Sequence, residues 1–391
     1  MENVVITAAV RTPVASFQGA FKDLPAPKLG ASAIREAVKR SSLSPGDIDE
    51  CIMGEVLTAG VGQAPARQAA IFAGLAPSTA CLTINKVCGS GLKAVMLAAD
   101  SIQLGNSKIV VAGGQENMTL APHLMENSRA GYRMGPATIV DSMVKDGLWD
   151  PYSNWHMGNA AELCVQKYKF TREEQDQFAI DSYKKAQTAM AQNVFKNEIV
   201  GVEVADRKGT VTIDKDEEPG KAMFDKMPGL RPAFDKAGTI TAANASKLND
   251  GAAALVLMSE TEAKKRNVKP IAKVIAHGTF AQEPNWFTTA PVGAIKSALA
   301  KAKLNIGDID LFEINEAFAV VPMAAMKELG IPHEKVNVHG GAVALGHPIG
   351  ASGTRTLVTL LNALKARNVR IGIDALCIGG GEAVAMAVER C

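Results

Sequence analysis

The sequence contains no pair of cysteines in C-x-x-C spacing, and its six cysteines lie in apolar or glycine-rich surroundings. This distribution fits a reducing compartment, in which some cysteines are buried and one or two can be reactive. No apolar run reaches the roughly 18 residues of a membrane span, and the first residues resemble neither a secretory nor an Arg-rich transit segment. We therefore expect a cytoplasmic protein, or the mature form of an organellar matrix protein, with no membrane association.

An excess of either charge is also absent, because 42 Lys and Arg balance 40 Asp and Glu to a net charge of +2. Nothing therefore indicates nucleic acid or an anionic membrane as partner. The 47% apolar and 21% charged residues are typical of globular proteins and exclude a disordered or fibrous chain. The 391 residues predict two or three domains at about 150 residues each, and 35 glycines indicate several tight turns. A soluble enzyme is the leading class.

The chain contains an internal repeat. Three motifs occur twice in the same order: GDID at 46–49 and 307–310, Ser-Gly at 90–91 and 352–353, and IVVAGG at 109–114 with ALCIGG at 375–380. Matches in one order predict two copies of one αβ unit, which gives an α/β fold class. We place the copies at residues 1–119 and 268–391, and residues 250–267 could complete the first.

Residues 120–249 differ from both copies. They contain many polar residues and methionines, a predicted amphipathic helix near 171–193 and a charged turn at 214–221. The segment therefore reads as an inserted cover over a core formed elsewhere, and a plain structural insertion is the alternative.

Cys88 directly precedes a predicted helix that ends near Gly105. Unpaired backbone N–H groups and the helix dipole favour a thiolate there, so we expect a lowered pKa and a nucleophilic sulfur. A buried structural cysteine is the alternative reading. Gly89, Gly91 and Ala94 also satisfy G-x-G-x-x-A, but that fingerprint needs an apolar strand immediately before the first glycine. Asn-Lys at 85–86 occupies that place, which argues against nicotinamide or flavin binding.

Two later segments carry further candidates. His347 lies between a glycine turn and Pro348, a position that would hold the imidazole in one orientation, as a general base requires. A histidine bonded only to its own loop is the alternative. Cys377 ends an apolar run and precedes three glycines whose N–H groups could form an anion-binding nest. Asn315 in NEAFA could hold a water or cap a helix.

In combination these motifs resemble the thiolase family along the whole chain. The segments that carry the resemblance occur in family order: INKVCGSGLKA at 84–94, HMGNAAEL at 156–163, GTITAANASKLNDGAAA at 238–254, NEAFA at 315–319, GGAVALGHPIGASG at 340–353 and CIGGG at 377–381. The resemblance is greatest to short-chain acetyl-CoA acetyltransferases. It implies a thiolase fold, with two duplicated αβα-layered halves and an inserted loop domain that binds CoA.

The resemblance also implies a reaction, the reversible condensation of two acetyl-CoA molecules to acetoacetyl-CoA and CoA. Cys88 falls on the nucleophile that forms the acyl-enzyme, and His347 on the histidine that takes its proton. Cys377 falls on the cysteine that deprotonates the second acetyl-CoA. The enolate oxygen would meet His347 and a water held by Asn315, and the acyl oxygen would meet the N–H groups of Cys88 and Gly379.

Substrate contacts are implied in the same way. The positions that line the pantetheine tunnel or contact CoA fall on Leu148, His156, Met157, Leu230, Phe234, Ala242, Ser246, Ala317 and Phe318, and Lys226 with Lys221 could pair with phosphates. The family implies no tightly bound cofactor. One relative binds potassium, and its ligand positions fall on Tyr183, Ala242, Ala243, Ala245 and Val343.

The sequence departs from the family at two places. Glu382 and Ala383 replace an uncharged residue and a glycine after CIGGG, so a carboxylate could raise the pKa of Cys377 or point to solvent. Thr288 and Ala290 replace glycines beside the acyl pocket, which leaves a longer-chain 3-oxoacyl-CoA thiolase as the alternative. A CoA-binding protein without catalysis would have lost a cysteine or the histidine. The family implies a homotetramer or homodimer, with residues 120–145 as candidate tetramer contacts.

Overall fold

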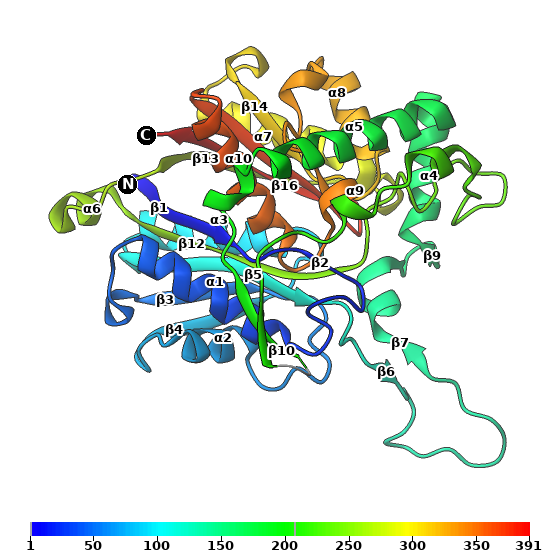
Figure 1. Ribbon diagram of the computed structural model, residues 1–391, viewed down its shortest axis with the longest axis horizontal. Helices are drawn as coiled ribbons and strands as arrows, with labels where there is room; N and C mark the ends of the chain where they lie inside the picture. Colours follow the sequence, from blue (N-terminus) through cyan, green and yellow to red (C-terminus); the bar gives the residue numbers. More distant parts are fainter. Residues whose placement is uncertain (1, 207–208) are drawn as a thin grey trace.

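The computed structural model describes residues 2–206 and 209–391. Its main sheet runs in the order β14-β15-β16-β13-β1-β12-β5-β3-β4 (Figure 1). In this order, β1, β12, β5, β3 and β4 belong to the first half of the chain, and β14, β15, β16 and β13 belong to the second. Only two residue pairs, Val5 with Lys273 and Ile6 with Ala272, join β1 to β13. The two halves are therefore two sheets that touch along one short seam.

The strands of the main sheet divide between the two halves of the chain, as the internal repeat predicts. The first half comprises β1 (Val4–Arg11), β3 (Glu50–Gly54), β4 (Ala80–Ile84), β5 (Ile109–Asn117) and β12 (Asn249–Ser259), with the short β2 (Ala15–Ser16) paired to β12. The second half comprises β13 (Ala272–Ala281), β14 (Leu311–Ile314), β15 (Ile371–Ile378) and β16 (Glu382–Arg390). Since β12 lies between β1 and β5, the chain returns to the first sheet after the insertion.

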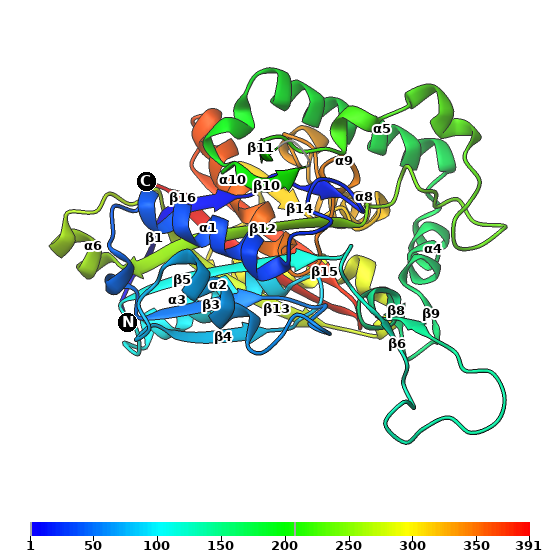
Figure 2. The ribbon, with the colours of Figure 1, turned by 60° about the horizontal axis from the view of Figure 1, so that its bottom comes forward.

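The helices form three layers around these sheets. In the middle, α3 (Ser90–Gln103) and α10 (Ser352–Ala366) share one apolar cluster with strands of both halves. On the outer faces, α1 (Ala26–Arg40) and α2 (Pro65–Ala73) cover the first sheet, and α7 (Ala290–Ala302) and α8 (Val320–Leu329) cover the second. Figure 2 shows α1 and α2 in front of β3 and β5. The predicted α/β fold with two layered halves is confirmed.

Equivalent hydrogen bonds mark the duplication. The Asp49 carboxylate accepts bonds from the N–H groups of residues 108–109, at 2.8 and 2.9 Å, where β5 begins. The Asp310 carboxylate accepts the same pair from residues 370–371, at 2.9 and 2.8 Å, where β15 begins. Each aspartate ends the GDID motif of its half, so the repeated motif fixes the start of a central strand in both copies.

The repeated Ser-Gly pairs lie where the two central helices cross. A Cβ on Gly91 would lie 2.7 Å from the Thr354 hydroxyl, and a Cβ on Gly353 would lie 2.4 Å from the Leu92 nitrogen. Contacts below about 3 Å do not occur for real Cβ atoms. Glycine therefore lets the N-termini of α3 and α10 meet, and this brings together the loops that precede the two helices.

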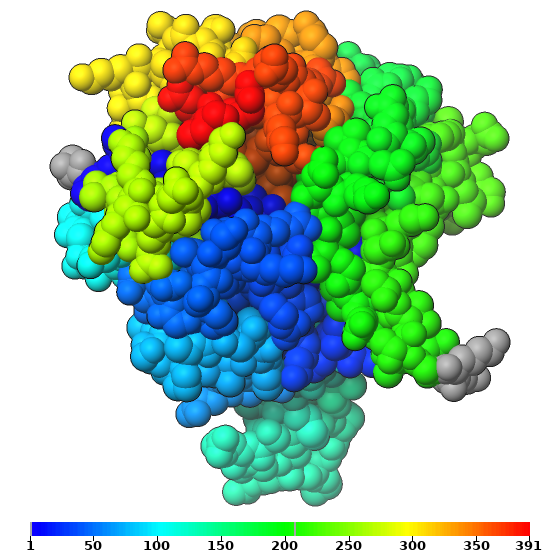
Figure 3. Space-filling model, turned by 60° about the vertical axis from the view of Figure 1, so that its left-hand side comes forward, coloured from blue at the N-terminus to red at the C-terminus, as the bar shows by residue number. Residues whose placement is uncertain are grey.

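The insertion lies along one side of both halves (Figure 3). It contains short strands, β6 (His123–Leu124), β7 (Val140–Asp141), β8 (Trp149–Asp150) and β9 (Trp155–His156), then α4 (Met157–Tyr168), α5 (Arg172–Ala191), β10 (Val202–Asp206) and β11 (Gly209–Ile213). The segment between β6 and β7 projects away from the body (Figure 1). Two short helices outside the insertion complete the chain, α6 (Glu260–Arg266) and α9 (Ala342–Leu345).

A buried ion cluster attaches the insertion to the first half. The fully buried Arg11 guanidinium lies 2.6 Å from Glu198 and 2.7 Å from Asp216. Removal of Arg11 would leave the two buried carboxylates without a counter-charge, which is costly. Within the described residues, none of the helices has both the length and the apolar character needed to cross a bilayer.

Candidate active site

A cavity of about 400 Å³ opens where the two halves and the insertion meet. Many of the site residues predicted from the sequence line it: Cys88, Leu148, His156, Met157, Phe234, Ala242, Ser246, Ala317, Phe318, His347 and Gly379. Further walls come from residues that were not predicted as site residues, chiefly Met143, Val144, Leu248, Phe287 and Ile349. The walls are mostly apolar, so the cavity suits a narrow, largely apolar substrate arm.

A strained turn presents Cys88 to this cavity. Val87 adopts a φ of 44°, in the left-handed region that β-branched residues rarely enter. The Ser90 hydroxyl stabilises the turn, because it accepts a bond from the Lys86 N–H (2.8 Å) and donates one to the Val87 carbonyl (2.6 Å). Such strain persists only where the surroundings impose it, and it is common at functional sites.

The expected low pKa of Cys88 is not what the structure favours. Burial is the largest effect and raises the pKa of Cys88 to about 11, and the nearby Glu116 carboxylate adds to the rise. Hydrogen bonds from the N–H groups of Gly379 and of Cys88 itself lower the pKa without compensating. The sulfur is therefore a thiol at rest, and two amides from different halves of the chain point at it.

His347 is held in one orientation, as its turn predicted. Its Nδ1 lies 2.6 Å from the Ser352 hydroxyl, which donates to the Pro348 carbonyl at 2.8 Å. Since that hydroxyl proton goes to the carbonyl, Nδ1 carries the ring proton and Nε2 has the free lone pair. The buried Nε2 has no hydrogen-bond partner. Burial lowers the pKa of His347 to about 3, and the Arg355 charge adds to this, so the ring is neutral.

The loop around His347 is bonded to the first half of the chain by residues that were not predicted as site residues. Asn249 accepts a hydrogen bond from the His347 N–H at 2.9 Å. The Glu116 carboxylate accepts three more, from the N–H groups of Gly350 (2.8 Å) and residues 56–57 (3.0 and 3.2 Å). Because these bonds cross between segments far apart in sequence, spacing alone could not indicate them.

Two of the predicted site residues, Cys377 and Asn315, are buried and are not among the residues that line the cavity. Cys377 is fully buried near the end of β15, and burial, followed by the proximity of Cys88, raises its pKa well above the usual value. Asn315 is 1% exposed, and neither its amide nitrogen nor its oxygen has a partner. The capping alternative for Asn315 is wrong, because α8 begins at Val320 with Ala319 as its N-cap. A buried amide without partners is costly unless a water or substrate meets it.

The three glycines after Cys377, at 379–381, differ in whether the structure requires glycine at their position. A Cβ on Gly379 would meet nothing closer than 3.7 Å, so a side chain would fit at this position. Gly380 and Gly381 instead adopt φ values of 90° and 83°, which disfavour other residues. A Cβ on Gly381 would also lie 2.5 Å from the Gln282 carbonyl. Backbone conformation therefore requires the later glycines, and it turns the Gly379 N–H toward Cys88.

Glu382 does neither of the two things expected of it, which were to raise the pKa of Cys377 or to point to solvent. Its carboxylate forms an ion pair with Lys86, which lies two residues before Cys88. The rise in the pKa of Cys377 comes from burial and from other thiols, chiefly Cys88. The departure from the family pattern thus adds an ionic contact between the two catalytic loops. Thr288 and Ala290, the second departure, are buried without lining the cavity, whereas Phe287 does line it.

The remaining predicted contacts lie outside the cavity walls. Lys221 bonds to the Ser16 hydroxyl, and Lys226 is exposed on the 3-10 helix Phe224–Gly229. Leu230 packs against a separate apolar cluster that also contains Tyr183 and Val343.

Inside the cavity, the centroids of the His156 and Phe234 rings stack 4.6 Å apart, and the Phe318 ring meets the Phe234 ring edge-on at 5.9 Å.

The residues expected to bind potassium do not fit that ion in this arrangement. The Lys247 ammonium donates hydrogen bonds to the carbonyls of Ala242 (2.6 Å) and Ala245 (2.8 Å), and it lies 5.7 Å from the centroid of the Tyr183 ring. A bound cation would need those same oxygens and would meet a positive charge. Among the described residues, no cluster of His, Cys, Asp or Glu offers another metal site either.

We therefore expect turnover to be equal in potassium and sodium buffers of the same ionic strength. Lys247→Met, which keeps the chain length without the charge, should lower the free energy of unfolding by about 1.5–3 kcal/mol per lost bond. Denaturant unfolding of the variant beside an exposed control, Lys226→Met, measures this. Strong stimulation of the unmodified enzyme by potassium would contradict the assignment.

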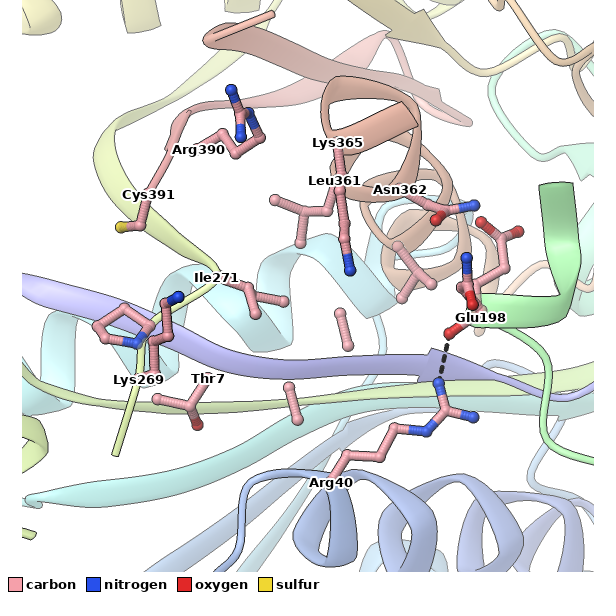
Figure 4. A pocket seen from close by; sticks show the side chains of 15 residues that line it. Thr7, Arg40, Glu198, Lys269, Ile271, Leu361, Asn362, Lys365, Arg390 and Cys391 are labelled. Carbon is pink, nitrogen blue, oxygen red and sulfur yellow. Dashed lines mark hydrogen bonds between the residues drawn. The ribbon is translucent and has the colours of Figure 1, made fainter. Parts of the chain in front are cut away.

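A larger cavity, of about 550 Å³, lies between β1, α10 and the C-terminus (Figure 4). Arg40, Lys365 and Arg390 line it, and Cys391 supplies its sulfur. No histidine occurs among the described residues that line it. The smaller cavity, which combines a thiol, a neutral imidazole and convergent amides, is therefore the candidate active site.

Comparison with known proteins agrees with this fold and site. The thiolase N-terminal domain model matches residues 4–261, and the thiolase C-terminal domain model matches residues 268–390. The chain belongs to the thiolase family, and it is an acyltransferase. It is 53% identical to an acetyl-CoA acetyltransferase of Cupriavidus necator, over the full length of both chains. It is 51% identical to a probable acetyl-CoA acetyltransferase of Dictyostelium discoideum, covering all of this chain and 94% of that one.

Two solved structures are similar along the whole chain. The acetyl-CoA acetyltransferase of Bacillus anthracis superimposes with a TM-score of 0.98 at 42% identity, covering 100% of this chain and 99% of that one. A thiolase from Ascaris suum in complex with coenzyme A gives 0.96 at 46% identity and covers all of both chains. The predicted family and fold are thereby confirmed.

Proposed function

We propose that the protein is an acetyl-CoA C-acetyltransferase, which reversibly condenses two acetyl-CoA molecules to acetoacetyl-CoA and CoA. The observation that carries this proposal is the single cavity that Cys88, His347 and Gly379 line together, in which the backbone N–H groups of Cys88 and Gly379 are available as donors. Such preorganised donors stabilise an oxyanion that forms next to the nucleophile. The names of the relatives and the coenzyme A complex of the Ascaris suum thiolase support CoA thioesters as substrates.

In the first half-reaction, the Cys88 sulfur attacks the thioester carbonyl while its proton passes to the free Nε2 of His347. The carbonyl oxygen becomes negative and is stabilised by the amides of Cys88 and Gly379. The carbon–sulfur bond to CoA then breaks, and the imidazolium returns its proton to the departing CoA thiolate. Because the pKa of Cys88 is about 11, the proton leaves during the attack and no free thiolate accumulates.

In the second half-reaction, Cys377 passes its thiol proton to the free Nε2 of His347 and, as a thiolate, removes a proton from the methyl group of a second acetyl-CoA. The resulting enolate oxygen accepts one hydrogen bond from the protonated Nε2 of His347 and one from a water on the unpartnered amide of Asn315. The enolate carbon attacks the acetyl-Cys88 carbonyl, a carbon–carbon bond forms, and the Cys88 thiolate leaves and takes the proton from Nε2 of His347, so that both cysteines end as thiols. Acetoacetyl-CoA is released, and the enzyme returns to its starting state.

The walls of the cavity favour a short acyl group. The Met157 thioether lies beside the catalytic loop, 3.7 Å from where a Cβ of Gly379 would be. Phe234 and Phe318, whose rings meet edge-on, also line the cavity. Turnover of acetoacetyl-CoA should therefore exceed that of 3-oxoacyl-CoA thioesters with eight or more acyl carbons, whereas the reverse ranking would indicate a longer-chain thiolase.

We also propose a homo-oligomer. Tyr132, Met134 and Ile139 are exposed on the segment that projects between β6 and β7, and Met134 is fully exposed. Exposed apolar side chains on one projecting segment indicate a protein interface. Light scattering during size exclusion distinguishes a tetramer, a dimer and a monomer.

Mass spectrometry of the acyl-enzyme tests the proposed function. The protein is mixed with acetyl-CoA, quenched in acid and digested with trypsin, which releases Cys88 in the peptide 87–93 and Cys377 in the peptide 371–390. We expect one acetyl group on 87–93, and none on the same peptide of Cys88→Ser. Formation of acetoacetyl-CoA with the acetyl group on 371–390 would overturn the assignment.

The pKa of Cys88 leads to a separate prediction, about how the rate of inactivation by iodoacetamide depends on pH. Between pH 6 and 9 the thiolate fraction rises about tenfold per pH unit, because the whole range lies below a pKa of about 11. His347 is neutral throughout, since its pKa is about 3. Inactivation by iodoacetamide should therefore accelerate steadily with pH. A plateau near neutral pH would instead indicate a thiolate–imidazolium pair.

A further inference from the structure

Two cysteines outside the active site face each other on neighbouring strands. Cys51 of β3 and Cys81 of β4 are direct partners in a parallel register. Paired residues of adjacent strands point to the same face of the sheet. Both pack with the apolar cluster between the first sheet and α1 and α2, where Cys51 is fully buried and Cys81 is half-buried. Neither lines the catalytic cavity.

The spacing of the two strands suits a disulfide. Adjacent strands lie about 4.7–4.9 Å apart. Disulfide-bonded cysteines usually have Cα atoms about 4.4–6.8 Å apart. The two thiols already share a hydrogen bond, in which Cys51 donates to Cys81. A bond between the sulfurs therefore needs side-chain rotation and no change of strand register.

The surroundings make the two sulfurs unequal. Arg67, from α2, places its Nη1 3.8 Å from the Cys81 sulfur and is itself fixed by the carbonyls of Thr79 (2.6 Å) and Pro77 (2.8 Å). The hydrogen bond from Cys51 and the Arg67 guanidinium lower the pKa of Cys81 to about 6, against burial and the Glu50 carboxylate. The pKa of Cys51 lies well above its usual value, because of the same hydrogen bond and burial.

We propose that Cys81 and Cys51 form an oxidation site in which a hydroperoxide converts the two thiols into a disulfide. The Cys81 thiolate attacks the outer oxygen of hydrogen peroxide, the O–O bond breaks, and hydroxide leaves as water after it takes up a proton. Cys51 then attacks the Cys81 sulfenic acid, and its own proton leaves with the hydroxyl group as a second water. Two thiols are oxidised by two electrons and one peroxide is reduced to two waters.

The position of the pair connects it to the catalytic loop. β4 leads through Ile84 directly into the turn that carries Cys88, and β3 ends at Gly54 against the start of α3. A Cβ on Gly54 would lie 2.6 Å from the Ser90 carbonyl carbon, so this junction has no spare room. A covalent bond between β3 and β4 would therefore restrain the strand that positions the nucleophile. A dithiol reductant would reverse the modification.

Tryptic peptide mapping tests the proposal directly. The reduced full-length protein is treated with increasing hydrogen peroxide, free thiols are alkylated, and the protein is digested without reduction. Trypsin places Cys51 in peptide 41–67 and Cys81 in peptide 68–86. We expect these two peptides to appear linked, and dithiothreitol to separate them. If Cys81 stays alkylatable while peptide 87–93 is oxidised or linked to 371–390, the proposal is overturned.

Three variants sharpen this test. Cys51→Ala should leave a sulfenic acid on Cys81 that dimedone traps, without the linked peptides. Arg67→Met should slow the alkylation of Cys81 at pH 5 about tenfold, as expected for a pKa rise of one unit from about 6 when the pH lies below both values. Cys391→Ser, which removes an exposed cysteine, should oxidise like the unmodified protein. Because Arg67→Met removes the cleavage site between the two peptides, linkage is measured in Cys391→Ser. Oxidation of Cys81 in Cys391→Ser to the same extent as in Cys51→Ala, without linked peptides, would refute the pairing even if one variant folds poorly.

Discussion

Replacing Cys88 by serine is expected to reduce condensation about 10⁴-fold or more, since the loss of a nucleophile removes most of the catalysis that the site supplies. A hydroxyl group is far less acidic than a thiol, and His347, whose pKa is about 3, is too weak a base to help it. The fold should be unaffected, because oxygen is smaller than sulfur and the amides of Cys88 and Gly379 still have an acceptor.

The measurement is the initial rate of acetoacetyl-CoA thiolysis and of acetyl-CoA condensation, with a thermal unfolding curve for each protein. Cys391→Ser is the matched control, because it makes the same atomic change at an exposed residue that does not line the catalytic cavity. A Cys88→Ser enzyme that keeps near-normal turnover would remove Cys88 as nucleophile, and the proposed function with it.

The sequence indicated the candidate catalytic groups because their signal is local. Cys88 precedes a helix with clear apolar periodicity, and His347 lies between a glycine turn and a proline. The GDID repeat also predicted the duplication, since each aspartate holds the start of a central strand in its own half. Short-range patterns of this kind can be recognised in the sequence because they do not depend on tertiary contacts.

Properties that depend on burial could not be predicted in this way. The helix N-terminus suggested a low pKa for Cys88, but desolvation outweighs the amides and raises it. Lys247 was not recognised as a cation that occupies the Ala242 and Ala245 carbonyls, because backbone carbonyls leave no trace in sequence. The pairing of Glu382 with Lys86 joins residues almost 300 positions apart. Each of these depends on which segments the fold brings together.

Replacing Cys377 by alanine should separate the two half-reactions. Acetyl transfer to Cys88 uses His347 and the amides of Cys88 and Gly379, so it should continue at close to the normal rate. Formation of the carbon–carbon bond needs a base for the methyl proton, and loss of a general base typically costs about 10²–10⁴-fold. Condensation should fall by that factor while peptide 87–93 still carries the acetyl group.

Exchange of labelled CoA into acetyl-CoA reports the first half-reaction alone, and condensation reports both. Cys377 is fully buried, so its truncation removes a sulfur atom from a packed core and should cost about 1–2 kcal/mol of stability. Cys164→Ala is the matched control, because Cys164 is also a fully buried thiol and has no proposed part in the reaction. Equal losses of exchange and condensation in Cys377→Ala would mean that Cys377 supports the structure of the site and does not act as the base. A loss confined to condensation, absent from Cys164→Ala, is the result that its burial beside Cys88 predicts.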